Sequence, residues 1–511
     1  MAVPMSKYYL TTTLPYVNAD PHVGFALEIV QADALARYHR LLGDDVAFNT
    51  GTDEHGQKIY QKSVEAGEEP QAYCDRYAAK FDGLKAALNL TYTRFIRTTD
   101  AHHVAAAQEF WRRCKAAGDI YKKQYRTKYC VGCELEKTDS ELEDGRCPIH
   151  PKLPIELRDE ENYFFRWSRS QQALLNHYAA HPDFVLPDFR LKEIRNFVAA
   201  GLQDFSISRL KAKMPWGIDV PDDPAHVMYV WFDALVNYVS TLGWPEDAAN
   251  FAAFWGTDGA PNAVQVAGKD NLRQQSAMWQ GMLLSAGLPL SKQVFIHGFI
   301  TADGQKMSKS LGNVVNPYDL VATYGTDATR YFLLGAIPSY NDGDYTKALF
   351  EETYAARLAN GIGNLAARVT TMAGKFSGGA SPAKAEDRFA TQALWTRYRD
   401  ALDAFRFDDA VHAVEELVAL CNQAIDVEAP WKKAKAGEDV GPFLYQLLEA
   451  LRHAGLMLLP VIPQAAEKLL AALGVDASSV RLPRDAAWGL LAPGTKIESG
   501  VILFPRLDAN S

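Results

Sequence analysis

The chain has 511 residues, of which 48% are hydrophobic, and its formal net charge is −9. This length predicts roughly two to four domains, and the hydrophobic content excludes a disordered chain. The negative charge disfavours a general nucleic-acid binder but leaves room for a local basic patch. No segment is typical of a signal peptide or a membrane span, so we expect a soluble, cytoplasmic protein with no membrane partner.

The first 118 residues alternate between strand and helix patterns. A β-prone run at residues 8–13 precedes the first helical pattern, and a second strand at 46–50 ends in a polar loop. The helical patterns lie at residues 26–42, 57–66, 70–88 and 102–117. This alternation predicts a Rossmann-like, doubly wound parallel sheet, in which ligands bind at the carboxyl ends of strands. His22 and Asp53 each follow a strand, so one pocket could hold both.

Two loops have the residue types of a phosphate site. His22 and Gly24 lie at the start of a helix, where free backbone N–H groups bind anions and the missing Cβ of glycine lets a nucleotide approach. Lys306 and Lys309 lie on a glycine-flanked loop, and lysine is a flexible point charge that suits a polyphosphate. The alternatives are an ordinary strand-to-helix turn and a solvated basic turn.

Three of the six cysteines gather in one polar segment after residue 120. Cys-x-x-Cys at Cys130 and Cys133 is followed by Cys-x-x-His at Cys147 and His150. Four such ligands on two turns have the spacing of a tetrahedral structural zinc site, which leaves no open position for chemistry. Reduced cysteines without metal and a disulfide pair are the alternatives, and the second is uncommon in a cytosolic enzyme.

The remaining patterns divide the chain further. Strand patterns at 264–270 and 294–296 flank a helical pattern at 272–286, so the doubly wound domain resumes after an insertion. Past residue 348 the patterns are almost wholly helical and predict a bundle. The expected parts are a first catalytic half at 1–118, an insertion with the zinc knuckle at 119–225, a second catalytic half at 226–298, a loop and stem-contact region at 299–347, and the helical bundle at 348–511.

The strings HVGF at residues 22–25 and KMSKS at 306–310 together resemble the two signatures of class I aminoacyl-tRNA synthetases. Within that class the chain looks most like the methionyl-tRNA synthetases, in their bacterial form with one zinc knuckle. The strings GTDEHG, VMYVWFDALVNY, VAGKD and HGFI carry the resemblance through the catalytic part, and NLAAR and EAPW carry it in the helical part.

The resemblance implies a ligase with one structural Zn²⁺, which activates methionine with ATP and Mg²⁺ and transfers it to the 3′ end of tRNA(Met). It implies catalytic roles for His22, Lys306 and Lys309. It implies ATP contacts from Asn18, Gly24, Asp270 and Lys309. It implies a methionine pocket made of Leu14, Tyr16, Asp53, Trp231, Tyr238 and His297. Aromatic walls suit a thioether, and a carboxylate such as Asp53 suits the substrate ammonium. Core packing is the alternative for Trp231 and Tyr238.

In the helical part the resemblance implies that Asn364, Arg368 and Trp431 read the anticodon. Asn364 and Arg368 are one helical turn apart and share a face, and an aromatic platform with polar neighbours suits unstacked bases. A buried bundle residue is the alternative for Trp431. No appended domain for dimerisation is visible, so we expect a monomer.

Two positions depart from the family pattern. Phe25 stands where the family commonly has a second histidine, and Gln274-Gln275 stand where many members have Phe-His. The alternatives to a methionine enzyme are a leucyl, isoleucyl, valyl or cysteinyl synthetase, a small-molecule nucleotidylyltransferase, and a non-catalytic tRNA-binding relative. The leucyl, isoleucyl and valyl enzymes would carry a long editing insertion. A nucleotidylyltransferase would not need the bundle, and a non-catalytic tRNA-binding relative would have degenerate signatures.

Overall fold

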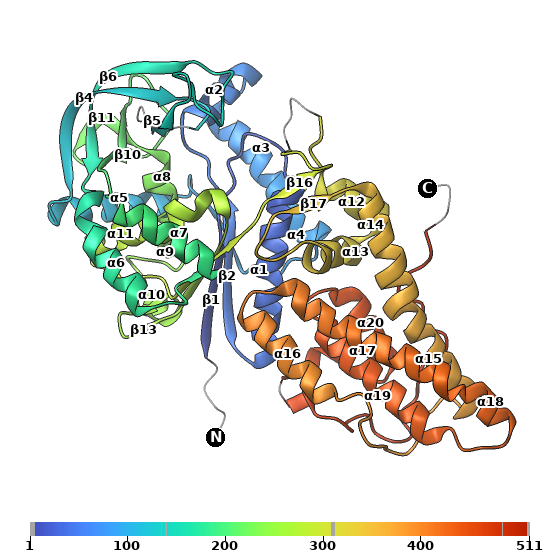
Figure 1. Ribbon diagram of the computed structural model, residues 1–511. Helices are drawn as coiled ribbons and strands as arrows, with labels where there is room; N and C mark the ends of the chain where they lie inside the picture. Colours follow the sequence, from blue (N-terminus) through green and yellow to red (C-terminus); the bar gives the residue numbers. More distant parts are fainter. Residues whose placement is uncertain (1–5, 134, 138–140, 308–311, 483, 508–511) are drawn as a thin grey trace.

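The computed structural model describes residues 6–133, 135–137, 141–307, 312–482 and 484–507. Lys309, predicted to be catalytic, therefore lies outside the described residues. Figure 1 shows an α/β part with a β-rich insertion at its upper end and a helical bundle, drawn in orange and red, at its lower end.

The α/β part is built on one six-stranded parallel sheet of order β3-β2-β1-β14-β15-β7. Its strands are β1 (Lys7–Thr12), β2 (Asp45–Thr52), β3 (Arg94–Arg97), β7 (Val185–Leu186), β14 (Ala263–Gly268) and β15 (Gln293–His297). The chain order reverses between β1 and β14, where ligands bind in open α/β sheets. The structure confirms the predicted doubly wound fold.

Side chains alternate across this sheet, as the strand period requires. Leu10, Phe48 and Phe295 belong to one buried core, which also contains α1 (Val23–Leu42) and the helical bundle. Tyr9, Ala47 and Ile296 belong to a second core with α5 (Ala101–Ala116) and α11 (Trp279–Ala286). The sheet is therefore covered on both faces, which explains its almost uninterrupted apolar strands.

The local patterns placed α1, α2 (Gln57–Ala66) and α5 within a few residues of their observed bounds. The pattern at 70–88 covers α3 (Pro70–Asp82) and α4 (Leu84–Ala87). Three short helices were not predicted, namely α8 (Val230–Ala234), α9 (Asn237–Ser240) and α10 (Ala248–Trp255). Two expected helices differ. The pattern at 70–88 is interrupted at Gly83, and the one at 272–286 begins with a π-helical turn at Gln274–Met278.

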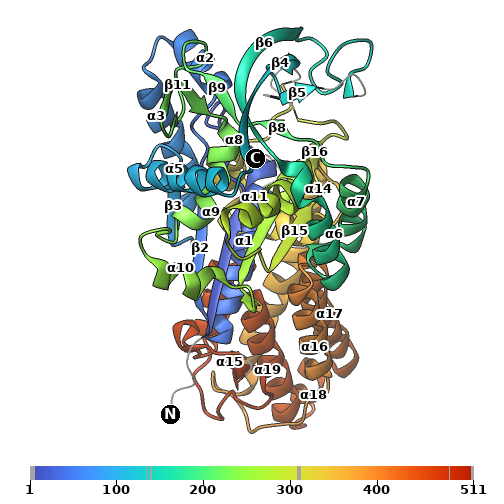
Figure 2. The same cartoon turned by 90° about the vertical axis from the view of Figure 1, so that its left-hand side faces the viewer.

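The insertion carries two small antiparallel sheets, seen at the top of Figure 2. One has the order β5-β4-β6-β8 and the other the order β10-β11-β9. The bounds are β4 (Ile120–Cys130), β5 (Leu135–Lys137), β6 (Ile155–Phe165), β8 (Phe205–Ser206), β9 (Ser208–Leu210), β10 (Asp219–Val220) and β11 (Asp223–Met228). Helices α6 (Gln171–Ala180) and α7 (Asp188–Ala199) follow β6.

One strand inside the predicted insertion belongs to the catalytic sheet. Strand β7 lies inside the expected 119–225 segment, yet it pairs with β15 as the edge strand of the catalytic sheet. Its two residues give no strand pattern, so the excursion back to the sheet has no local signal in the sequence.

After α10, β12 (Gly256–Thr257) pairs with β13 (Ala260–Pro261). Between the sheet and the bundle, β16 (Ile300–Ala302) pairs with β17 (Gly343–Tyr345). The helices here are α12 (Pro317–Tyr324) and α13 (Thr326–Tyr331), and a π-helical turn follows at Phe332–Ala336. The bundle then contains α14 (Lys347–Thr353), a π-helical stretch at Tyr354–Gly363, α15 (Asn364–Phe376), α16 (Thr391–Asp403), α17 (Phe407–Glu428), α18 (Pro430–Lys435), α19 (Gly441–Leu458) and α20 (Pro463–Ala472).

A buried arginine joins the sheet region to the bundle. Arg330 on α13 pairs with Asp33 of α1 at 2.8 Å, and both side chains are fully buried. Its other hydrogen bonds go to the carbonyl oxygens of Leu88, Pro460 and Val461, at 2.9–3.0 Å. Four of the five N–H donors of the guanidinium are thus used, by partners from both parts of the molecule. Among the described residues, no helix is both long and apolar enough to span a membrane.

Candidate active site

The carboxyl ends of β1, β2, β14 and β15 bring most of the predicted site residues together. Tyr16 follows β1, Asp53 follows β2, Asp270 follows β14, and His297 is the last residue of β15. Backbone contacts lock the first two side by side, because Tyr16 and Asp53 form a parallel bridge and the Asp53 N–H donates to the Pro15 carbonyl at 3.0 Å. The pocket therefore lies at the switch point of the sheet.

His22 caps helix α1 through its own ring. Its Nδ1 accepts a hydrogen bond from the Gly24 N–H at 3.1 Å, so in the neutral ring Nε2 carries the hydrogen and can donate to a ligand. Enclosure by the protein lowers the pKa of His22 below its usual 6.5, while Asp270 acts in the opposite direction. The ring remains accessible to solvent at the rim of the site.

The expectation that the Gly24 N–H is free for phosphate is wrong in this structure. That N–H is bound to His22, and the Val23 N–H donates to the Val315 carbonyl at 2.9 Å. A Cβ on residue 24 would lie 2.9 Å from the His22 ring, so the glycine makes room for the histidine. The polar group that this turn presents to solvent is consequently the imidazole of His22.

Glu28 is the main site residue that sequence reasoning missed. Its Oε1 accepts hydrogen bonds from the N–H (2.7 Å) and hydroxyl (2.6 Å) of Thr13, after β1, and its Oε2 accepts one from the Gly268 N–H (3.1 Å) at the end of β14. The same Oε2 lies 3.1 Å from His297 Nε2. This buried carboxylate ties the two central strands together at the switch point. A glutamate within a helical pattern gave no local signal of this role.

His297 uses both ring nitrogens inside the protein. Its Nδ1 lies 2.7 Å from the Gly298 carbonyl, which can only accept, so Nδ1 carries a hydrogen. Its Nε2 faces Glu28, so the imidazole and the carboxylate share a further hydrogen between them. His297 is therefore placed beside the pocket as predicted, but as the partner of Glu28.

The aromatic residues predicted to bind methionine form one cluster. Trp231 on α8 donates its indole N–H to the Tyr16 hydroxyl at 3.1 Å. Tyr238 on α9 is buried, and the charges of Glu28 and Asp53 act on its hydroxyl. Asp53 is itself buried. Leu14 lies in the half-buried loop between β1 and Tyr16, and Asn18 follows in the same loop.

The opposite side of the pocket is open and charged. Enclosure by the protein raises the pKa of Asp270 above its usual 3.8, and Glu28 adds to this, whereas His297 and Lys306 lower it. Lys306 is exposed, and its ammonium lies 5.8 Å from the centre of the Phe299 ring. His22, Asp270 and Lys306 thus surround one accessible region.

The two departures from the family pattern have local structural reasons. Phe25 packs edge-on against Phe81 of α3, with ring centres 5.3 Å apart, so its surroundings are apolar. Gln275 lies in the π-helical turn and donates to the Tyr238 hydroxyl at 2.6 Å. The first position is used for packing and the second for a buried hydrogen bond.

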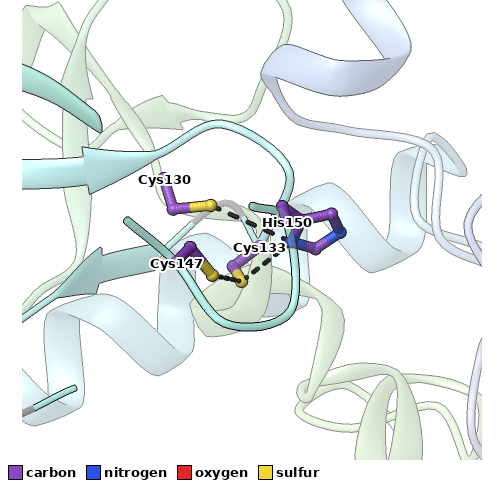
Figure 3. A group of neighbouring side chains, drawn as sticks. All are labelled: Cys130, Cys133, Cys147 and His150. Carbon is purple, nitrogen blue, oxygen red and sulfur yellow. Dashed lines mark hydrogen bonds between the residues drawn. The ribbon is translucent and has the colours of Figure 1, made fainter. Parts of the chain in front are cut away.

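The four predicted metal ligands converge, as Figure 3 shows. The ligand atoms of Cys130, Cys133, Cys147 and His150 all lie within 4.8 Å of one another. Cys133 Sγ lies 3.2 Å from His150 Nδ1 and 3.4 Å from Cys147 Sγ. Gly132 is required beside them, because a Cβ there would lie 2.5 Å from the His150 ring. None of these cysteines forms a disulfide, and three thiols with one imidazole fit a tetrahedral metal site.

The predicted anticodon residues lie at the far end of the bundle. Asn364 begins α15 and is exposed, and Arg368 reaches Asn422 and Asp426 of α17, each at 3.2 Å. Trp431 follows Ala429, whose left-handed backbone ends α17, and 45% of its surface is exposed. The alternative of a buried bundle tryptophan is therefore wrong.

Comparison with known proteins agrees with this architecture. The family model described as tRNA synthetases class I (M) matches residues 8–152 and 133–370, and the one described as the anticodon binding domain of methionyl tRNA ligase matches residues 377–511. A methionine–tRNA ligase of Thermosynechococcus vestitus is 44% identical, with 98% of each chain covered. One of Streptomyces coelicolor is 40% identical, covering 98% of this chain and 97% of the relative.

Comparison with solved structures leads to the same family as the comparison of sequences. The Mycobacterium tuberculosis methionyl-tRNA synthetase in complex with methionyl-adenylate matches with a TM-score of 0.91 and 38% identity, over 98% of this chain and all of that one. Its ligand-free form matches with a TM-score of 0.85 and 36% identity, over 99% of each chain. Since both family models and full-length relatives agree with the fold and the site, this chain belongs to the methionine–tRNA ligase family of class I aminoacyl-tRNA synthetases.

Proposed function

We propose that this chain joins methionine to tRNA(Met) in two steps at the pocket described above, by forming methionyl-adenylate from ATP and then transferring the amino acid to the tRNA 3′ end. The observation that carries the proposal is the arrangement of a buried carboxylate, Asp53, beside the aromatic pair Tyr16 and Trp231, with the charged rim at His22 and Asp270 on the other side. An amino acid fits the first side and a nucleotide the second.

Each group has a chemical task in this proposal. Asp53 takes the substrate ammonium, Tyr16 and Trp231 surround the thioether, and Asp270 holds the ATP ribose. The substrate carboxylate attacks the α-phosphate, so the protein supplies positioning and charge stabilisation without a nucleophile of its own. His22 Nε2–H donates to a phosphate oxygen, and Lys306 and Lys309 close over the phosphates. Mg²⁺ accompanies ATP, as is usual for nucleotide phosphates.

The decisive test is ATP–pyrophosphate exchange with each of the twenty amino acids in the absence of tRNA. We expect exchange with methionine alone. Exchange with leucine, isoleucine, valine or cysteine instead would keep the two-step chemistry and overturn the substrate. No exchange with any amino acid would contradict the activation step itself, and restoration of exchange by Phe25→His would then trace the loss to that position.

We further propose that Cys130, Cys133, Cys147 and His150 hold one structural Zn²⁺. Four protein ligands leave no open coordination position, so this metal stabilises the insertion and takes no part in the chemistry. Metal analysis of the purified protein should give one zinc per chain, and Cys130→Ser should lose it. Cys421→Ser, which changes a buried thiol in the bundle, is the matched control and should retain it. Full zinc in Cys130→Ser would contradict the assignment.

The anticodon assignment is tested by separating the two reactions. Trp431→Ala should raise the KM for tRNA(Met) in aminoacylation by about 5- to 150-fold, because stacking of one base is worth roughly 1–3 kcal/mol. Methionine-dependent exchange without tRNA should be unchanged. Val427→Ala removes another exposed apolar side chain, four residues earlier in the chain at the end of α17, and serves as control. Equal tRNA KM values in Trp431→Ala and the control would refute the role.

Three broader expectations complete the proposal. The enzyme works as a monomer in the cytoplasm. Residues 1–118 and 226–298 serve catalysis, and residues 119–225 bind zinc. Residues 299–347 close over the phosphates, and residues 348–511 bind the anticodon. A dimer mass in size-exclusion chromatography with light scattering would refute the first of these.

A further inference from the structure

A tight hairpin brings Lys306 to the rim of the candidate site. After β16 the chain turns at Asp303 and Gly304, whose φ angles are both positive, at 52° and 70°, as in a type I′ turn. Ala302 and Gln305 close this turn, because the N–H of each donates to the carbonyl of the other, at 2.9 and 3.1 Å. Lys306 follows Gln305 directly, so the turn sets the position of its backbone.

The turn is held by β17, which runs parallel to β16 (Figure 1). Asp344 Oδ1 accepts hydrogen bonds from the Gly304 N–H at 2.9 Å and from the Thr301 hydroxyl at 2.6 Å. The carbonyl of Tyr345 accepts from the Asp303 N–H at 3.1 Å. A single carboxylate oxygen thus joins the strand before the turn to the turn itself.

A second carboxylate, Asp342, fixes the aromatic ring next to the Lys306 side chain. Asp342 Oδ1 accepts from the Phe299 N–H at 2.9 Å, and the two carboxylate oxygens pair with the ammonium of Lys269 at 2.6 and 2.8 Å. The Lys269 and Lys306 ammonium groups lie 4.4 and 5.8 Å from the centre of the Phe299 ring. Asp342 and Asp344 are two residues apart and so share one side of their strand.

The two lysines beside Phe299 differ in their charge partners. The charge of Lys269 is neutralised by Asp342. Within the described part of the chain, no carboxylate forms an ion pair with Lys306, whose charge instead acts on Asp270. The ammonium of Lys306 is therefore available to a negatively charged ligand, whereas that of Lys269 is committed to the protein.

We propose that Asp342 and Asp344 are positioning residues for adenylate formation, which hold the Lys306 ammonium where it can reach the phosphates of ATP. Asp344 acts through the backbone of the hairpin, and Asp342 acts through Phe299. Lysine has a flexible four-carbon side chain, so its charge is useful in the transition state only if its surroundings restrict it. This inference rests on the proposed role of Lys306 and adds how the fold places that residue.

The experiment is single-turnover formation of methionyl-adenylate by the full-length enzyme, with each rate divided by the concentration of active sites. A partly unfolded variant then still gives a valid rate. Asp344→Ala should slow this step by about ten- to hundredfold, since a displacement of about 1 Å can cost that much. The KM for methionine should be unchanged, because the hairpin does not contribute to the aromatic pocket.

Conservative variants separate hydrogen bonding from charge. Asp344→Asn keeps the one oxygen that accepts both hydrogen bonds, so its rate should stay within about fivefold of wild type. Asp342→Asn keeps an acceptor for the Phe299 N–H but loses the ion pair with Lys269, so it should slow the step less than Asp342→Ala does.

A double-mutant cycle shows whether Asp344 acts through Lys306. In a Lys306→Ala background, the further change Asp344→Ala should slow adenylate formation by less than about twofold, because the group that it positions is already absent. Asp258→Ala changes an exposed aspartate in the turn between β12 and β13 and is the control, with an expected wild-type rate.

Two results would overturn the inference. One is a wild-type rate in both Asp342→Ala and Asp344→Ala. The other is an equal loss from Asp344→Ala with and without Lys306, which would make its effect independent of the lysine. A wild-type rate in Lys306→Ala would instead refute the proposed role of that lysine, and absence of adenylate in the wild-type enzyme would refute the proposed function.

Discussion

The two sides of the candidate active site are built differently. On the amino-acid side, Asp53, Tyr238 and His297 are buried and held by hydrogen bonds that reach back into the sheet. On the side proposed for the nucleotide, His22 and Lys306 are exposed, and the contacts of their side chains are local, with Gly24 for the imidazole and Phe299 for the ammonium. A prearranged pocket suits the selection of a small side chain, whereas an open charged rim suits groups that close only as charge develops in the transition state.

The largest effect is expected on the open side. Lys309→Ala should slow adenylate formation by several hundred-fold, since a charge-stabilising group is worth roughly 3–4 kcal/mol in the transition state. The KM for methionine should stay unchanged, because the pocket is formed without this lysine. Single-turnover measurement of adenylate formation gives both values, and Lys375→Ala on the bundle surface is the control. An activation rate within twofold of wild type would refute the role.

On the amino-acid side, where the side chains are buried, we expect a mutation to lower the stability of the protein. Glu28→Gln puts an amide nitrogen where a carboxylate oxygen accepts from a backbone N–H, which leaves one buried donor without a partner. The free energy of unfolding should fall by roughly 1–3 kcal/mol, measured by urea denaturation. Glu65→Gln, at an exposed helix position, should change it little. An unchanged midpoint in Glu28→Gln would show that the switch point is held by other contacts.

A smaller effect should follow from the contact between Trp231 and Tyr16. Trp231→Phe removes the indole N–H that donates to the Tyr16 hydroxyl. The KM for methionine should rise about fivefold with kcat unchanged, as expected for the loss of one hydrogen bond of about 1 kcal/mol. Tyr16→Phe should have a similar effect, and the double change should add little. Fully additive effects would mean that the two side chains act independently.

The smallest effect concerns pH. His22 Nδ1 accepts from Gly24 only while it is unprotonated, and enclosure keeps the pKa of His22 below 6.5. The cap is therefore intact above pH 6.5 and is lost as the pH falls through the lowered pKa. The activation rate should be flat from pH 6.5 to about 8 and decline below. His22→Asn keeps a capping oxygen that does not titrate, so a decline of equal size in this variant would assign it to another group.

The sequence predicted the elements whose signals are local. The pattern at residues 57–66 matches α2, and the first strand and helix are within a few residues of β1 and α1. The clustering of Cys130, Cys133, Cys147 and His150 was also predicted, because their spacing is contained in one segment. These features depend on contacts between residues that are near in the chain, and such contacts leave a periodic or spaced pattern.

The features that were missed depend on distant partners. Glu28 is 240 residues from Gly268, and Gln265 meets Ser291 only because β14 and β15 lie side by side. The interruption of the helix at Gly83 and the edge strand β7 are likewise set by tertiary packing. The occupied Gly24 N–H was missed for a different reason, because its partner is only two residues away and the anion-binding expectation considered the helix end without the His22 imidazole.

The buried Arg330 has a consequence for how the two parts of the protein contact an RNA. Its partners belong to both the sheet region and the bundle, so the two parts cannot separate without leaving a charge unpaired in the interior, at a cost of about 3–5 kcal/mol. The boundary that the sequence suggests near residue 348 is therefore not a hinge. This contact therefore holds the separation between the pocket and Trp431, which we propose to read the anticodon, and we expect the protein to select an RNA by its length as well as by its bases.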